Sequence, residues 1–246
     1  MTLYLPKSCG WGNALMMVVD EVMSSENPRV YKSVMEYECD AFDWRRFDIA
    51  TSKKEDPYEA KVIINPHYYS KNHVNIQSIL EPTEKMKEMI KKYDQGCKWG
   101  MHIRRGAYSK DSENMGCHGL DENGNIKKAF FANDVAIEKF KKIVESKPGK
   151  FFLASDSQEI KDMFKKLYPD KIVTLDNNAV LTYDCDFLKN DVSKADRFAT
   201  YLEWFLLAKS KYVFITAGNK DMTDFSTFGY TAACFGDASI QFVTNY

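Results

Sequence analysis

The chain has 246 residues, of which 44% are hydrophobic, and its 34 basic and 35 acidic side chains give a net charge of −1. A chain of this size can bury a substantial core, in one large domain or two small ones. The balanced charge excludes a global field that would attract nucleic acid or an anionic membrane surface, so any anion binding must be local.

The sequence indicates a cytoplasmic protein without a resident metal. Residues 1–25 lack the basic start, apolar centre and cleavage site of a signal peptide, and no window has the apolar run of about 18 residues that spans a membrane. The six cysteines form no C-x-x-C pair, which favours reduced thiols over disulfides or a zinc site. His67, His73 and His118 have no ligand spacing with one another or with a cysteine.

Short apolar runs alternate with helical patterns from the start of the chain. Strands are predicted at residues 2–6 and 61–66, and a glycine-led helix at residues 12–25. A polar amphipathic helix follows at residues 82–96, with Gly96 as its stop.

After Gly96 the alternation of strands and helices becomes regular. The predicted strands are residues 98–103, 150–155, 171–175 and 211–216, and the predicted helices are residues 131–146, 158–167, 193–209 and 226–235. Strands separated by helices of this length predict a parallel sheet with right-handed crossovers.

Polar residues follow three of these strands, at their carboxyl ends, where open parallel sheets bind their ligands. HIRRG (102–106) ends one strand, SDS (155–157) ends the next, and TAGNKD (216–221) ends another, with DFSTFG (224–229) just beyond. The three ends would face one crevice containing two arginines, an aspartate and a helix N-terminus. Such a set is typical of a phosphate or diphosphate site.

Each of these motifs also has an ordinary structural explanation. Strand alternation places Arg104 and Arg105 on opposite faces, so one guanidinium can bind a ligand while its neighbour pairs with protein. CGWGNA (9–14) can be a simple strand-to-helix turn capped by Asn13, and SDS (155–157) can supply a helix cap. DENGN (121–125) is interpreted as a turn, since its glycine is misplaced for a calcium loop.

Four segments in order resemble the motifs of the GDP-L-fucose-dependent α-1,2-fucosyltransferases and, more distantly, those of the α-1,6- and protein O-fucosyltransferases. GWGN (10–13) is similar to the family's G-x-G-N, and HIRRGAY (102–108) to its H-x-R-R-G-D-Y. FFLASDS (151–157) is similar to F-F-x-F-S-D-D, and STFGYTAA (226–233) to S-T-F-S-W-W-A-A. The four motifs together span nearly the whole chain.

The resemblance implies a GT-B-like α/β fold with two Rossmann-like halves. The first half, residues 1–96, would be short and lie on the acceptor side, and the second, residues 97–246, would bind the nucleotide sugar. The implied reaction is an inverting, metal-independent transfer of fucose from GDP-L-fucose to a hydroxyl of a glycan acceptor, without a cofactor.

The resemblance also implies roles for individual residues. Arg104 would grip the β-phosphate, and Asn13 would lie near the donor sugar or the acceptor; these two are the catalytic candidates. Asp156, Glu203 or both would fix guanosine. The donor nucleotide site as a whole would comprise Gly12, His102, Arg105, Asp156, Glu203, Ser226, Thr227 and Phe228.

Several positions depart from the family pattern. Ala107 stands where the family has an acid, Ser157 replaces the second acid of S-D-D, Tyr230 and Thr231 replace the two tryptophans, and Ala14 replaces a glutamine. These departures leave two alternatives open. The same scaffold could use another nucleotide sugar, or it could be a catalytically silent nucleotide- or glycan-binding module.

Overall fold

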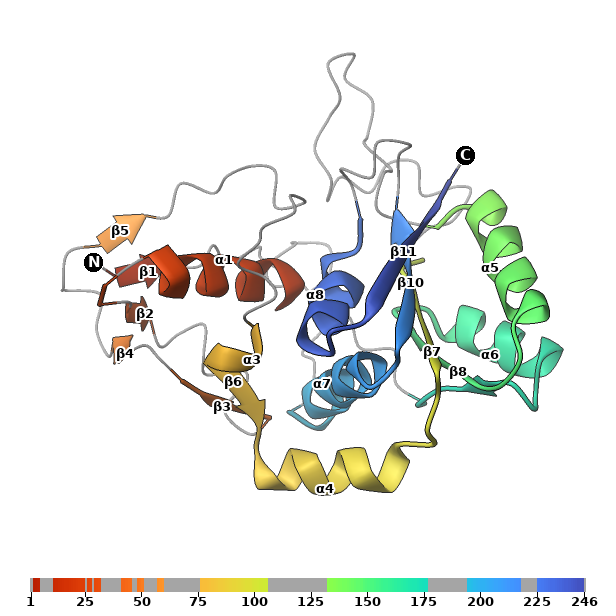
Figure 1. Cartoon of the computed structure of the whole chain (residues 1–246), viewed down its shortest axis with the longest axis horizontal. Coiled ribbons are helices and arrows are strands. Elements are labelled where there is room, and N and C mark those ends of the chain that lie inside the picture. Colours follow the sequence, from red (N-terminus) through yellow and green to blue (C-terminus); the bar gives the residue numbers. More distant parts are fainter. Residues whose placement is uncertain are drawn as a thin grey trace, which may run out of the picture.

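The computed structural model describes residues 2–4, 11–24, 26–27, 29–31, 41–45, 48–50, 57–59, 76–105, 132–176, 194–217 and 225–245. The predicted strand at 61–66, the turn at 121–125 and four motif residues lie outside these ranges: Gly10, Gly106, Ala107 and Tyr108. The described elements form a small sheet near the N-terminus and a larger one toward the C-terminus (Figure 1).

The small sheet has four parallel strands in the order β4-β2-β1-β5. They are β1 (Thr2–Tyr4), β2 (Arg29–Tyr31), β4 (Asp48–Ala50) and β5 (Pro57–Glu59). Beside them, β3 (Phe42–Trp44) pairs antiparallel with β6 (Leu80–Pro82). Of these six strands, the sequence predicted only the first, because a strand of three residues carries almost no periodic signal.

Three helices accompany this part of the chain: α1 (Trp11–Ser24), α3 (Ile76–Ile79) and α4 (Glu84–Tyr93). The predictions for α1 and α4 are confirmed. Thr83 caps α4 by accepting a hydrogen bond from the amide of Met86 (3.3 Å). Gly96 follows with a φ of 64°, a left-handed conformation that suits glycine at a helix stop.

The larger sheet has five parallel strands in the order β11-β10-β7-β8-β9. They are β7 (Trp99–Ile103), β8 (Phe151–Ser155), β9 (Ile172–Val173), β10 (Tyr212–Ala217) and β11 (Ser239–Thr244). The first four confirm the predicted strands, whereas β11, a partly exposed edge strand, was not predicted. The strand order reverses between β7 and β10, and such a switch point is where doubly wound sheets bind ligands.

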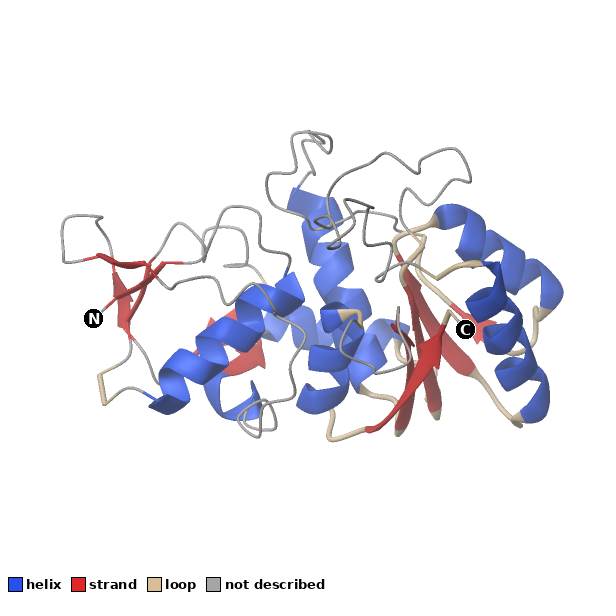
Figure 2. Ribbon diagram, turned by 90° about the horizontal axis from the view of Figure 1, so that it is seen from above, coloured by secondary structure: helices blue, strands red, loops and turns tan. Residues whose placement is uncertain are grey.

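Helices cover both faces of this sheet (Figure 2). They are α5 (Asp134–Ser146), α6 (Gln158–Leu167), α7 (Lys194–Ala208) and α8 (Thr227–Phe235), all as predicted to within a few residues. Alternate side chains of β8 show the two faces: Phe151 and Leu153 pack with α5 and α6, whereas Phe152 and Ala154 pack with α7 and α8. The predicted α/β class and parallel sheet are therefore confirmed.

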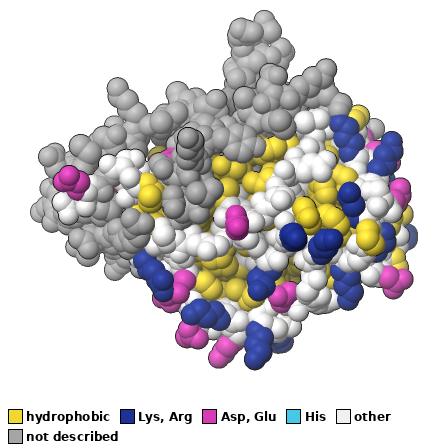
Figure 3. All heavy atoms as spheres, in the orientation of Figure 1, with side chains coloured by type: hydrophobic (Ala, Val, Ile, Leu, Met, Phe, Trp, Pro, Cys, Tyr) yellow, Lys and Arg dark blue, Asp and Glu magenta, His cyan; other side chains and the backbone are white. Residues whose placement is uncertain are grey.

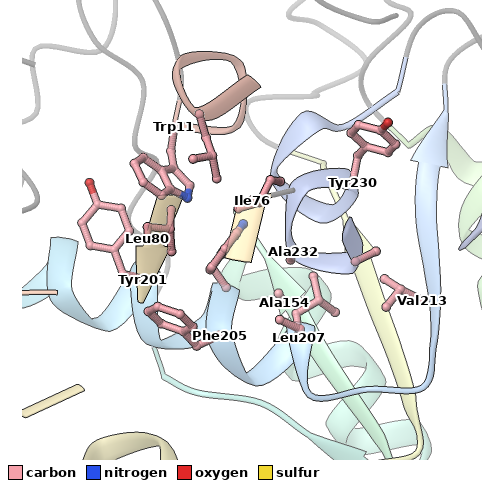
Figure 4. Close-up of a cluster of buried hydrophobic side chains, with 14 of the residues drawn as sticks. Trp11, Ile76, Leu80, Ala154, Tyr201, Phe205, Leu207, Val213, Tyr230 and Ala232 are labelled. Atoms are coloured by element: carbon pink, nitrogen blue, oxygen red, sulfur yellow. The ribbon is translucent and has the colours of Figure 1, made fainter. Parts of the chain in front are cut away.

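One apolar cluster joins α1 and α3 to the helices of the larger sheet (Figure 4). The ring of Trp11 lies 5.1 Å from that of Tyr201 and 6.1 Å from that of Trp204, measured between centroids. Ile76 and Leu80 are fully buried in the same cluster. This packing places the start of α1 against α7 and α8. The division of the chain into halves at residue 96 stays a prediction.

The described surface carries charges of both signs. Basic and acidic side chains are interspersed on the face seen in Figure 3. Within the described ranges, no helix has the length and apolar character needed to cross a membrane.

Candidate functional site

Arg104 stands at the switch point, one residue beyond β7. Its amide donates a hydrogen bond to the hydroxyl of Thr216 on β10 (3.2 Å), and that hydroxyl donates to the carbonyl of His102 (3.2 Å). The Arg104 side chain is 25% exposed, and its Nε lies 3.9 Å from Oδ2 of Asp156, which is 10% exposed. A guanidinium is thus held half-buried where the strand order reverses.

Arg105 turns to the other side and pairs with protein. Its guanidinium donates to the carbonyl of Ala132 (2.6 Å) and to the carboxylate of Asp134 (2.7 Å), at the start of α5. Its amide donates to Oδ1 of Asp156 (2.8 Å). Arg105 therefore pairs with protein, as strand alternation allows for one of the two arginines. A nucleotide-binding role for Arg105 stays a prediction.

The SDS segment supplies one helix cap and one carboxylate that faces the two arginines. Ser157 caps α6 by accepting a hydrogen bond from the amide of Ile160 (3.4 Å), and Ser155 donates to the carbonyl of Ile103 (2.6 Å). These contacts leave Asp156 at the strand end, where it faces Arg104 and Arg105. Of the three residues that could have capped the helix, Asp156 is the one that contacts the two arginines.

The N-terminus of α8 lies beside the carboxyl end of β10. The amide of Ser226 donates to the carbonyl of Thr216 (3.0 Å), which fixes the helix start beside the strand end. Ser226 is 2% exposed, makes no side-chain cap, and its hydroxyl has no hydrogen-bond partner in the described part of the chain. A buried, unsatisfied hydroxyl at the positive end of a helix is suited to an anion.

Gly12 and Asn13 reach this helix from the first half of the chain. A Cβ on Gly12 would lie 2.4 Å from the carbonyl carbon of Thr227, so the glycine allows α1 and α8 to touch. Because α1 begins at Trp11, Asn13 lies within its first turn and does not cap it. Oδ1 of Asn13 is buried and, among the described residues, has no hydrogen-bond partner. A second unsatisfied polar atom therefore belongs to the residue that follows the contact between Gly12 and α8.

His102 is buried under the same helix. It is 5% exposed, its ring lies 4.9 Å from that of Phe228, and a Cβ on Gly229 would lie 2.7 Å from its own Cβ. No described residue bonds to its Nδ1. Burial, together with the positive charges of Arg104 and Lys161, lowers the pKa of His102 to about 3. The imidazole is therefore neutral at physiological pH.

We expect His102 to make folding stability depend on pH. Its pKa is lowered from 6.5 to about 3 on folding, so as pH falls the unfolded chain takes up the proton first and stability is lost. Between about pH 6 and 4, the free energy of unfolding of the wild type should fall by up to about 1.4 kcal/mol per pH unit more than that of His102→Gln. Urea unfolding at several pH values measures this difference, and parallel profiles for the two proteins would contradict it.

Glu203 is buried on α7 and paired with Lys161 of α6. Nζ of Lys161 lies 2.5 Å from Oε1 of Glu203, and the two side chains are 0% and 4% exposed. The pKa of Glu203 is raised on balance. Burial is the largest cause, the Lys161 ammonium opposes it, and the Asp156 carboxylate adds to it. Sequence reasoning missed Lys161, although its position beside Ile160 and Phe164 on the apolar stripe of α6 signals a buried lysine. A contact between Glu203 and guanosine stays a prediction.

The structure thus brings nearly all the predicted residues to one place. Arg104, Asp156, Ser226, Asn13 and His102 come from four elements or their ends, namely β7, β8, α8 and α1, and Thr227 and Phe228 lie in the first turn of α8. Among the described residues, no three His, Cys, Asp or Glu side chains gather as a metal site. A basic groove of about 240 Å³ lies elsewhere, between α5 and β11, and Lys139 and Lys142 are part of its lining.

Comparison with known proteins gives matches among solved structures. No protein-family model matches the sequence, and no curated protein matches it. The NodZ α-1,6-fucosyltransferase co-crystallized with GDP matches with a TM-score of 0.56 and 12% identity, over 94% of this chain and 91% of that one. NodZ from Bradyrhizobium, as its Se-Met form, matches with a TM-score of 0.53 and 14% identity, over 94% and 90%. NodZ soaked with GDP-fucose matches with a TM-score of 0.51 and 14% identity, over 95% and 92%.

These matches extend over both sheets, because they cover more than nine tenths of the chain. The similarity at this low identity concerns the fold. It confirms the GT-B-like architecture and, at the level of the fold, the resemblance to GDP-fucose-dependent fucosyltransferases. The matched structures are α-1,6 enzymes, so the α-1,2 type stays a prediction. The chain has the fold of the fucosyltransferase NodZ.

Proposed function

We propose that this protein is a glycosyltransferase that transfers fucose from GDP-L-fucose to a hydroxyl of a glycan acceptor, with inversion and without a metal. The observation that carries the proposal is the set of unsatisfied polar atoms around the N-terminus of α8. Ser226 Oγ and Asn13 Oδ1 are buried without partners in the described part of the chain. Ser226 is near the half-buried Arg104, because the amides of both residues donate to Thr216. Asn13 follows the Gly12 contact with α8. A diphosphate and a sugar hydroxyl have the groups that would satisfy them.

The chemistry follows from the charges at this site. The acceptor oxygen attacks the anomeric carbon of fucose, the bond from that carbon to the β-phosphate oxygen breaks, and its electron pair leaves with GDP. Arg104 and the N-terminus of α8 stabilise the negative charge that develops on the phosphate, the task that a divalent ion performs in other enzymes. The acceptor hydroxyl releases its proton to the solvent as the new bond forms, so the products are the fucosylated acceptor, GDP and one proton.

The two halves have separate tasks in this proposal. Residues 97–246 supply the larger sheet and bind the donor nucleotide, with Asp156, Glu203 or both near guanosine and His102, Arg105, Thr227 and Phe228 shaping the pocket. Residues 1–96 form the acceptor side, and α1 delivers Asn13 to the reacting sugar through the Gly12 contact. The similarity of fold to NodZ, which has been crystallized with GDP and soaked with GDP-fucose, supports this division.

We expect titration calorimetry to show binding of GDP and GDP-fucose at least about tenfold tighter than binding of UDP or ADP, with no change on adding a chelator. If the protein did not bind GDP at millimolar concentration, the proposal that it transfers fucose from GDP-fucose would be overturned. Preference for another nucleotide would favour a different donor sugar. Tight GDP binding without transfer or hydrolysis would favour the silent binding module, and a strict requirement for a divalent ion would contradict the metal-free mechanism.

A further inference from the structure

A buried ion pair connects the two helical layers at the carboxyl edge of the larger sheet. Lys161 belongs to α6, on the face that carries Phe151, and Glu203 belongs to α7, on the opposite face. Nζ of Lys161 lies 2.5 Å from Oε1 of Glu203 and also donates to the carbonyl of Leu175 (3.1 Å), just beyond β9. The pair therefore crosses from one face of the sheet to the other past the ends of its strands.

Asp156 is the neighbouring anion at this edge. It immediately precedes Ser157, the N-cap of α6, and Lys161 lies one turn into that helix, where its amide donates to the carbonyl of Ser157 (3.2 Å). The negative charge of Asp156 also raises the pKa of Glu203. One buried ammonium thus stands near two carboxylates. Glu203 binds it, while Asp156 accepts a hydrogen bond from the amide of Arg105 (2.8 Å) and faces Nε of Arg104 (3.9 Å).

We propose that Glu203 is a positioning residue: by holding the ammonium of Lys161, it leaves the carboxylate of Asp156 to Arg104 and Arg105. The inference rests on the proposed function, in which Arg104 grips the diphosphate. A fully buried ammonium requires an anionic partner. Without Glu203, Lys161 turns to Asp156, Arg104 loses its anchor, and the diphosphate site loses preorganisation.

A double-mutant cycle measured by GDP titration and thermal unfolding tests this competition. Glu203→Met should raise the Kd for GDP at least about tenfold, because it releases the ammonium toward Asp156. The double variant Lys161→Met with Glu203→Met removes both charges and should return the Kd to within about threefold of wild type. Lys171→Met, which removes a lysine bonded to the carbonyls of Val144 and Lys147, is the matched control and should leave the Kd unchanged.

The alternative roles give different results. If Glu203 binds guanosine directly, the double variant stays as weak as the single one. If the pair only stabilises the fold, the melting temperature changes and the Kd does not. Either result would overturn the inference. Should Glu203→Met fail to fold, Glu203→Gln, whose amide oxygen holds the ammonium more weakly, should raise the Kd in the same direction by a smaller factor.

A structure of Glu203→Met without nucleotide decides the inference separately from the proposed function. We expect Nζ of Lys161 to lie within hydrogen-bonding distance of the Asp156 carboxylate. An ammonium that remains away from Asp156 would overturn the competition, whether or not the wild type binds GDP. Failure of the wild type to bind GDP, with this shift observed, would count against the proposed function alone.

Discussion

Replacement of Arg104 by alanine should lower the rate of fucose transfer about a hundredfold or more, which corresponds to about 2 to 4 kcal/mol of lost transition-state stabilisation. The half-buried guanidinium is held next to Asp156 and the start of α8, where the charge of the departing GDP develops. Steady-state hydrolysis of GDP-fucose measures the effect without knowledge of the acceptor, and transfer assays extend it once an acceptor is found.

Arg45→Ala is the control for this variant. Arg45 is an exposed arginine that pairs with Glu81, on the β3-β6 ribbon, and its loss should leave turnover within about twofold of wild type. Circular dichroism should show that both variants remain folded. Near-normal turnover by Arg104→Ala would contradict the assignment of the diphosphate grip.

A single methyl group on Gly12 should damage both stability and donor binding. Its carbon would lie 2.4 Å from the carbonyl carbon of Thr227, and backbone cannot move aside as a flexible side chain can. Gly12→Ala should therefore lower the free energy of unfolding by about 1 to 3 kcal/mol, the usual cost of overpacking. The displaced α1 should also carry Asn13 away from α8 and weaken the binding of GDP-fucose.

Urea unfolding and GDP-fucose titration measure the two effects of Gly12→Ala. Ser24→Ala, an exposed change at the other end of α1, should stay within about 0.5 kcal/mol of wild type. If Gly12→Ala matched the wild type in both measurements, the close contact between α1 and α8 would be wrong.

The parts of the fold that could be predicted are those with long periodic signals. β7, β8 and β10 are buried on both faces and are therefore continuous apolar runs, which are easily recognised next to helices of nine or more residues. The short strands of the small sheet and the exposed edge strand β11 lack this signal. Their formation depends on pairing with distant parts of the chain, which no local pattern encodes.

The sequence predicted where the site residues lie in the fold better than it predicted the contacts that they make. Arg104, Asp156 and Ser226 lie at strand ends or helix starts, and topology brings such positions together. The local sequence does not show why position 12 needs a glycine, because the missing side chain makes room for the backbone of Thr227, far along the chain. The same holds for Arg105, whose partners Ala132 and Asp134 follow a long intervening segment.

A crystal structure of the protein with GDP bound tests the central claim most directly. The diphosphate should lie at the N-terminus of α8, with its β-phosphate within hydrogen-bonding distance of the Arg104 guanidinium and the Ser226 hydroxyl, and no metal ion between them. GDP found instead in the groove lined by Lys139 and Lys142, or a crevice at the start of α8 that stays empty at saturating GDP, would contradict it.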